Sequence, residues 1–159
     1  MADTKVEGSK ALIGLAVVAV VVGLGLGLFV YLSSASESEV SGSLTIDGEA
    51  FEPAHCRSGE LGEDAPRDRP EFHGVDLLTS SSGRTVRVLE DATEGPRVLV
   101  IDPGSAPRPI DRAACERFEV ELRETGTLIM DVWGMEGSVD LDCPAVQGNV
   151  RFDSCYGGR

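Results

Sequence analysis

The sequence predicts a mainly β protein, in which one N-terminal transmembrane helix precedes a small antiparallel β-sandwich or barrel stapled by disulfides. Three observations lead to this prediction. An uncharged apolar run covers residues 11–32. Beyond it, short stretches alternate apolar and polar residues and are separated by glycine, proline or aspartate. All four cysteines lie in that second part, and an even number of cysteines is typical of a protein in which all of them form disulfides.

The apolar run of residues 11–32 is long enough to cross a bilayer. Its helix would rise about 33 Å, against a hydrocarbon core of about 30 Å. A signal peptide has a shorter apolar region, of about 7–15 residues, so we expect an uncleaved signal-anchor. Cleavage and release is the alternative, because Ser33 and Ala35 occupy the −3 and −1 positions of a possible cleavage site.

The charges that flank the apolar run predict its orientation. Lys5 and Lys10 precede it, whereas Glu37 and Glu39 follow it. Because cationic flanks stay in the cytoplasm, residues 1–10 are expected to form a cytoplasmic tail. The C-terminal part then lies outside the cytoplasm, in the periplasm if the source is bacterial. The cysteines agree with this orientation, since disulfides persist in that compartment.

The apolar run also carries small residues at four-residue spacing, namely Ala19, Gly23 and Gly27. Such a stripe lets two helices approach closely, so these residues are candidates for self-association of the span. Glycine and alanine are also common in spans that do not associate. A homodimer through the membrane helix and a monomeric anchor are therefore both open.

The rest of the chain divides into a linker and one domain. Residues 33–43 are small, polar and lightly acidic, which is typical of a linker. Residues 44–159 are enough for one domain and too few for two cores. The part beyond the span holds 12 arginines, no lysine and 25 acidic residues, and so carries the whole net charge of −13. Such a surface disfavours nucleic acid and anionic lipid as partners.

Eight stretches have the alternation of strands, at spacings of roughly 8–14 residues that are typical of a sandwich or small barrel. They are residues 43–47, 73–79, 84–90, 97–102, 116–123, 127–133, 138–143 and 149–155. Turn residues separate several of them: Asp47 and Gly48, Ser82 and Gly83, Thr125 and Gly126, Gln147 and Gly148. The apolar alternates predict the core: Leu44, Ile46, Val75, Leu77, Val86, Val88, Val98, Val100, Phe118, Val120, Leu122, Leu128, Met130, Val132, Val139, Leu141, Val150 and Phe152.

One long segment, residues 53–71, lacks this alternation. It contains Cys56, five acidic residues, three arginines and three prolines. Loops of this length are usually functional or disordered, and this composition favours disorder. We therefore make no site prediction for this segment.

The pairing of the four cysteines follows from the predicted order of the strands. With a turn over residues 144–148, Cys143 and Cys155 lie about 20 Å apart, too far for a disulfide. If the last four predicted strands form an up-and-down meander, Cys115 and Cys155 fall at the same end. They also point to the same face. We therefore expect Cys115–Cys155 with Cys56–Cys143, a pairing that a different strand order would change.

No motif for catalysis, cofactor or metal binding accompanies the β pattern. His55 and His73 are interpreted as structural, because the paired cysteines of zinc sites are missing. Also missing are nucleophile elbows, EF-hand loops, P-loops and dinucleotide fingerprints. We expect no metal, no cofactor and no enzymatic activity. A hydrolase whose serine, histidine and carboxylate meet only in space is an alternative.

The last part of the chain has a recurring local pattern of glycine, alternating strand and cysteine. It occurs in residues 137–143 (GSVDLDC) and 148–155 (GNVRFDSC). Together with residues 42–48 (GSLTIDG), it resembles the small β-domains of bacterial envelope lipoproteins and single-span envelope proteins. This resemblance implies an envelope location and no catalytic residue. The chain departs from the lipoproteins because it lacks their acylated cysteine.

These observations lead to one expected function and one further alternative. We expect a single-pass membrane protein whose β-domain binds another envelope protein or supports envelope structure, without catalysis. The further alternative is a carrier or sensor that holds a small apolar ligand between its sheets.

Overall fold

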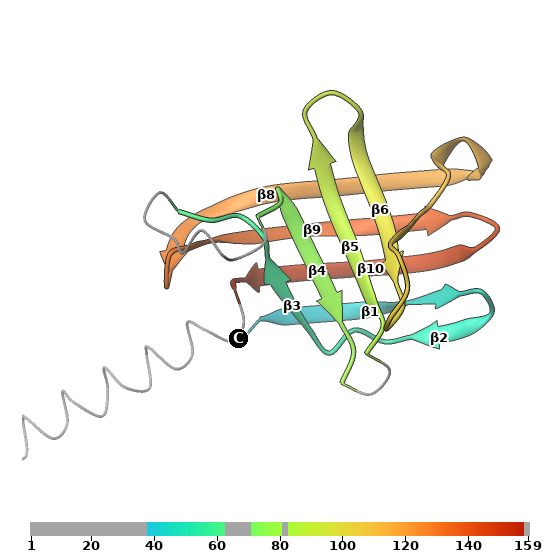
Figure 1. The fold of residues 1–159 in the computed structure, drawn as a ribbon, viewed down its shortest axis with the longest axis horizontal. Coiled ribbons are helices and arrows are strands. Elements are labelled where there is room, and N and C mark those ends of the chain that lie inside the picture. The colour runs from blue at the N-terminus through green and yellow to red at the C-terminus, as the bar shows by residue number, and fades with distance from the viewer. Residues whose placement is uncertain (1–37, 63–70, 81–82, 158–159) are drawn as a thin grey trace, which may run out of the picture. The chain divides into compact units, whose positions relative to one another are not determined.

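The computed structural model describes residues 38–62, 71–80 and 83–157. These residues form two five-stranded antiparallel sheets that pack face to face. In Figure 1 the strands of one sheet lie across those of the other. The predicted mainly β, sandwich-like domain is thereby confirmed. Among the described residues no helix is long and apolar enough to cross a membrane. The predicted tail, the apolar run and its candidates Ala19, Gly23 and Gly27 lie outside those residues.

The first sheet, sheet A, contains the two ends of the described chain. Its strands are β1 (Glu39–Ile46), β2 (Glu49–Phe51), β8 (Arg117–Ile129), β9 (Val132–Asp142) and β10 (Val146–Cys155). They follow one another in the order β2-β1-β10-β9-β8. The C-terminal strand β10 therefore lies in the middle of the sheet, between β1 and β9.

The second sheet, sheet B, is a meander in which each strand pairs with the next one along the chain. Its strands are β3 (His55–Ser58), β4 (Gly74–Leu78), β5 (Thr85–Asp91), β6 (Gly95–Ile101) and β7 (Arg108–Pro109). Sheet B thus occupies the middle of the sequence, inserted between β2 and β8 of sheet A.

The core lies between the two sheets and contains most of the residues that alternation predicts. The confirmed core residues are Leu44, Ile46, Val75, Leu77, Val86, Val88, Val98, Val100, Val132, Val139, Leu141, Val150 and Phe152. Phe118, Val120 and Leu122 on β8 pack against this core but are only partly buried. Phe51, Met135 and Val146 are buried core residues that the sequence pattern did not predict.

Two predicted core residues, Leu128 and Met130, are exposed instead, by 46% and 67%. The cause is that residues 127–133 do not form one strand. Met130 and Asp131 have positive φ angles of 48° and 62° and form the two-residue turn between β8 and β9. Hairpins favour such turns because their twist matches that of the strands. The chain therefore reverses in the middle of the predicted strand.

Thr125 and Gly126, predicted as a turn, lie inside the long strand β8. The register between β8 and β9 shifts between Glu124 and Leu128, which marks a β-bulge. Thr125 and Gly126 therefore belong to a bulged strand and not to a turn. The turn that the sequence predicts at Asp47 and Gly48 is confirmed, because these two residues connect β1 and β2.

The predicted disulfide pairing is wrong. Cys56 bonds Cys155, and Cys115 bonds Cys143. The predicted turn at Thr125 and Gly126 does not exist, so the chain has one strand fewer before Cys143 and Cys155 than the predicted meander has. Cys155 therefore lies at the end of sheet A opposite to Cys115. Because β8 and β9 are single long strands, Cys115 and Cys143 flank the same end of one hairpin. Cys56 on β3 and Cys155 on β10 link sheet B to sheet A.

Two predicted boundaries also move. The compact unit begins at Ser38 and β1 at Glu39, so residues 39–43 of the predicted linker, residues 33–43, belong to β1. The turn between β9 and β10 consists of Pro144 and Ala145, because Cys143 and Val146 exchange backbone hydrogen bonds of 3.0 and 3.2 Å. Gln147 and Gly148 therefore belong to β10.

The predicted long loop, residues 53–71, contains ordered structure near its start. His55–Ser58 form β3, and an isolated bridge joins Leu61 to Val132 of β9. Residues 63–70 lie outside the described ranges. The sequence missed β3 because only two of its four residues are buried and neither is a large apolar residue.

Asp91 caps the turn between β5 and β6. Its carboxylate accepts hydrogen bonds from the Thr93 hydroxyl (2.6 Å) and from the backbone N–H groups of Thr93 (2.8 Å) and Glu94 (3.0 Å). The hydroxyl bond, followed by the two backbone bonds, lowers the pKa of Asp91 from 3.8 to about 2.

We expect NMR titration of the Asp91 carboxyl carbon to give a midpoint near the lowered pKa of about 2. Because the folded pKa lies below the unfolded one, this carboxylate stabilises the hairpin above about pH 4 and loses that effect as the pH falls towards 2. Thr93→Val removes the hydroxyl bond and should raise the midpoint. A midpoint in the wild-type protein at the ordinary value of about 4 would contradict the cap.

Candidate functional site

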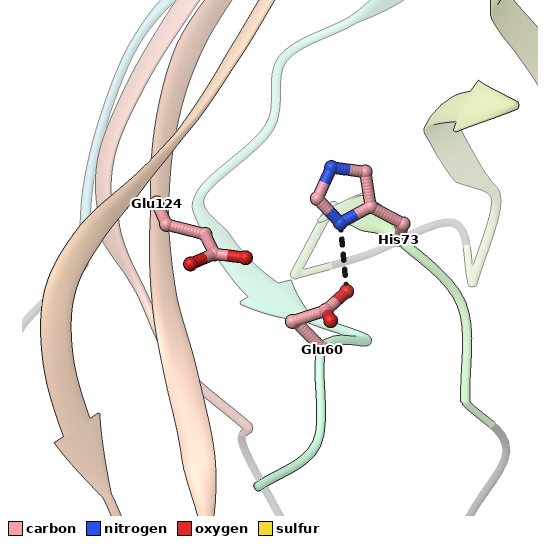
Figure 2. Close-up of side chains that lie close together, drawn as sticks. All are labelled: Glu60, His73 and Glu124. Atoms are coloured by element: carbon pink, nitrogen blue, oxygen red, sulfur yellow. Dashed lines mark hydrogen bonds and ion pairs between the residues drawn. The ribbon is translucent and has the colours of Figure 1, made fainter. Parts of the chain in front are cut away.

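Three side chains of types that can bind a metal ion meet where the β8 bulge of sheet A faces the segments beside β3 and β4 (Figure 2). They are Glu60, His73 and Glu124, whose ligand atoms all lie within 4.8 Å of one another. Glu60 Oε2 lies 2.8 Å from His73 Nδ1. In Figure 2 the Glu124 carboxylate points from β8 towards the other two side chains. We call these three residues the Glu60 cluster.

The backbone holds each member of the Glu60 cluster against a strand. Glu60 follows β3, and its carbonyl accepts a hydrogen bond of 3.1 Å from the N–H of Trp133 on β9. His73 precedes β4, and its carbonyl accepts one of 3.0 Å from the N–H of Glu90 on β5. Glu124 lies at the β8 bulge, where the register with β9 changes. The cluster is therefore built on both sheets.

The other ring nitrogen of His73 also faces a carboxylate. His73 Nε2 lies 3.8 Å from Glu90 Oε2. The side chains of Glu60, His73 and Glu90 are exposed by 22%, 41% and 51% respectively, so water reaches all of them. The imidazole thus lies between two carboxylates, with a third, that of Glu124, close to its Nδ1 side.

Among the residues that the structure describes, neither histidine has a hydroxyl or thiol as a hydrogen-bond partner. The hydrogen-bond and ion-pair partners of His73 among the described residues are carboxylates, and His55 has no such partner there. The cysteines are all in disulfides. Nucleophilic catalysis needs a hydroxyl or thiol within hydrogen-bond reach of a base, and the described part of the chain brings none to either ring.

A buried carboxylate lies on the outer face of sheet B. Asp76 is 0% exposed and sits between Arg57 on β3 and Arg87 on β5, its direct cross-strand neighbours. Arg57 donates to Asp76 Oδ2 at 3.0 and 2.9 Å, and Arg87 donates to both carboxylate oxygens at 2.6 and 2.9 Å. The Phe72 ring lies 3.8 Å from the Arg87 guanidinium carbon.

These contacts give Asp76 a structural role. Both of its oxygens accept charge-assisted hydrogen bonds from arginine, and its side chain has no exposed surface that a substrate could contact. The three side chains form a cross-strand ladder that ties β3, β4 and β5 together.

The outer face of sheet A carries a surface groove of about 540 Å³. One row of cross-strand neighbours crosses it from β8 to β1: Glu121, Ser138, Arg151 and Ser41. Further lining residues are Glu39, Val40, Arg123, Glu136, Gly137, Phe152 and Asp153. The groove is therefore a polar surface with four acidic side chains and two arginines, and we call it the sheet A groove.

A second hollow, of about 350 Å³, lies between β8 and the β5–β6 hairpin. Its lining includes Val120, Leu122 and Pro96, together with charged groups from Glu90, Glu121 and Arg123. Both hollows open to solvent, and the positions between the sheets are occupied by side chains that are nearly all fully buried. Among the described residues this arrangement does not favour a carrier of an apolar ligand.

Sequence reasoning found the disulfide cysteines but not the Glu60 cluster or the sheet A groove. The sequence indicates a polar strand-edge residue at His73, and Glu60 lies in the segment for which it supports no site prediction. The only local signal for the cluster is a histidine followed directly by a strand, which is too weak to indicate a ligand. No protein-family model, curated protein or solved structure matches the chain.

Proposed function

We propose that this chain is a single-pass membrane protein, anchored through residues 11–32, whose extracytoplasmic β-domain binds another protein of the cell envelope without catalysing a reaction. The observation that carries the proposal is the sheet A groove, a concave and charged surface on a rigid, disulfide-linked scaffold. The apolar run and the resemblance to envelope β-domains support the location.

The charges of the sheet A groove indicate the kind of partner. Glu39, Glu121, Glu136 and Asp153 surround Arg123 and Arg151. The rest of the domain is also strongly acidic and contains no lysine. A positively charged segment of another protein would therefore be steered towards the groove and would find carboxylates to pair with.

In-cell photocross-linking of the full-length protein tests this function. We expect a photoreactive residue at Ser138, in the groove, to give an adduct with a second protein in the membrane fraction. The matched control is Asn149 on β10, an exposed outer-face residue of sheet A that lies outside the groove, whereas Ser138 is half-buried in it. It should give at most about a tenth of that adduct.

Charge reversal provides the second arm of this experiment. Glu121→Lys with Glu136→Lys turns two of the four groove acids into cations, so the Ser138 adduct should fall at least about tenfold. Equal adducts from Ser138 and Asn149, adducts with the same chain alone, or adducts that survive the charge reversal would each overturn the proposed binding surface.

A further inference from the structure

We propose that Glu60, His73 and Glu124 bind a divalent transition-metal ion, with Zn²⁺ as the best match. This inference concerns a different surface from the sheet A groove and does not depend on the proposed function. Imidazole nitrogen and carboxylate oxygen are ordinary zinc ligands. The imidazole favours zinc or a similar metal over Ca²⁺ and Mg²⁺, which prefer sites made of oxygen ligands alone.

The distances in the Glu60 cluster are close to those of a tetrahedral site. Zinc bonds of about 2.0–2.1 Å to nitrogen and oxygen place neighbouring ligand atoms about 3.3 Å apart. Glu60 Oε2 and His73 Nδ1 are 2.8 Å apart, so they would separate by about half an ångström. Glu124 has to approach from at most 4.8 Å, which rotation of an exposed glutamate side chain allows.

Glu90 gives the site a feature that an ordinary surface ion pair lacks. A metal-bound histidine usually donates its other ring N–H to a carboxylate, which fixes the ring and makes it a better ligand. With the metal on Nδ1 of His73, the free position is Nε2, and Glu90 Oε2 lies 3.8 Å from it. The second carboxylate is therefore on the correct side of the ring.

The electric charge of the site also favours a cation. Glu60, Glu90 and Glu124 bring three carboxylates to one imidazole, and a divalent ion would relieve the repulsion between these carboxylates. Because two ligands come from the segments beside β3 and β4 and one from β8, the ion would join the two sheets. The three protein ligands leave one position of a tetrahedral ion for water.

Zinc titration of the full-length protein in detergent, after removal of metals by a chelator, tests the site. We expect one equivalent to bind in calorimetry, and one equivalent of Co²⁺ to give visible absorption of a tetrahedral ion. Glu124→Gln and His73→Gln should each weaken zinc binding by at least about tenfold, since even loss of a residue that only hydrogen-bonds a metal ligand costs that much. The Tm without metal reports whether each variant folds.

Glu119→Gln is the matched control, because it removes the same charge from an exposed position five residues earlier on β8. It should leave the zinc affinity within about twofold of the wild type. If it weakens binding as much as Glu124→Gln does, the ion is held by diffuse acidic charge and the site is refuted. Equal displacement of Zn²⁺ by Ca²⁺, or no saturable binding at one equivalent, would also overturn the proposal.

Discussion

Replacing Cys56 and Cys155 together by alanine is expected to destabilise the β-domain by about 4–5 kcal/mol, the largest effect of any change considered for this chain. The disulfide closes a loop with a sequence separation of 99 residues. In the chain-entropy description, closing a longer loop removes more freedom from the unfolded state. The same bond joins β3 of sheet B to β10 of sheet A, so the folded state also loses a link between its layers.

The second disulfide, Cys115–Cys143, is the internal comparison. Its sequence separation is 28 residues, and it closes the end of one hairpin within sheet A. Its replacement by two alanines should cost about 3–4 kcal/mol, which is less than the inter-sheet bond. Urea unfolding followed by far-ultraviolet circular dichroism gives both values on the same scale.

Two outcomes would contradict this ranking. One is an equal or larger loss of stability for the Cys115 and Cys143 variant. The other is a disulfide-linked peptide map of the wild-type protein that pairs Cys115 with Cys155, as the sequence alone predicted. The peptide map distinguishes an incorrect pairing from an incorrect energy, because it does not depend on stability.

Asp76→Ala is expected to destabilise the domain by about 3 kcal/mol, the largest effect that we expect of a single substitution. The substitution removes a fully buried carboxylate and leaves Arg57 and Arg87 without their common acceptor. Removing one partner of a buried ion pair usually costs about 3–5 kcal/mol. The lower end applies because the two arginine side chains are 43% and 23% exposed and can turn towards water.

Asp140→Ala is the matched control, since the Asp140 carboxylate also accepts a hydrogen bond from an arginine and lies on an inner strand, β9 of sheet A. Arg117 Nε donates to it at 2.8 Å, and this bond raises the pKa of Arg117. The Asp140 side chain is 39% exposed, and such surface pairs contribute about 1 kcal/mol or less. A urea midpoint for Asp76→Ala no lower than that for Asp140→Ala would contradict the structural role of Asp76. If Asp76→Ala does not fold, Arg57→Gln provides the same comparison.

The alternation of residues predicted which side of each strand is buried, but not where each strand lies in its sheet. Val86 and Val88 on β5 are fully buried, as their spacing of two requires. Phe118 and Val120 show the same spacing, yet they are only partly buried because β8 lies at the edge of sheet A. The order of strands depends on contacts between distant segments, which a local pattern does not contain.

The wrong disulfide pairing had a single local cause. Thr125 and Gly126 have the composition of a turn, and a bulge uses the same left-handed glycine conformation as a turn does, with φ of 72° at Gly126. One extra chain reversal inverts the direction of every later strand in the predicted sheet. The predicted positions of Cys143 and Cys155 are therefore at the opposite ends of the sheet from those in the structure. The cysteines themselves and their oxidised state were correctly predicted.

The Glu60 cluster lay beyond sequence reasoning for a different physical reason. Glu60 and His73 are neighbours because β3 and β4 pair, and Glu124 joins them because sheet A crosses sheet B. Each residue alone is an ordinary polar residue of an acidic chain. A ligand set that is assembled from three separate segments leaves no spacing that a motif can describe.

The position of β8 has a consequence for the solubility of the domain. Among the described strands that end a sheet, β2, β3 and β7 have two to four residues, whereas β8 has thirteen. A long edge strand offers unpaired backbone groups to other chains and so invites aggregation. Here β8 carries Arg117, Glu119, Glu121 and Arg123 at alternate positions and is bent by its bulge. Charged side chains and a bulge are two of the features by which native proteins keep an edge strand from pairing with another chain.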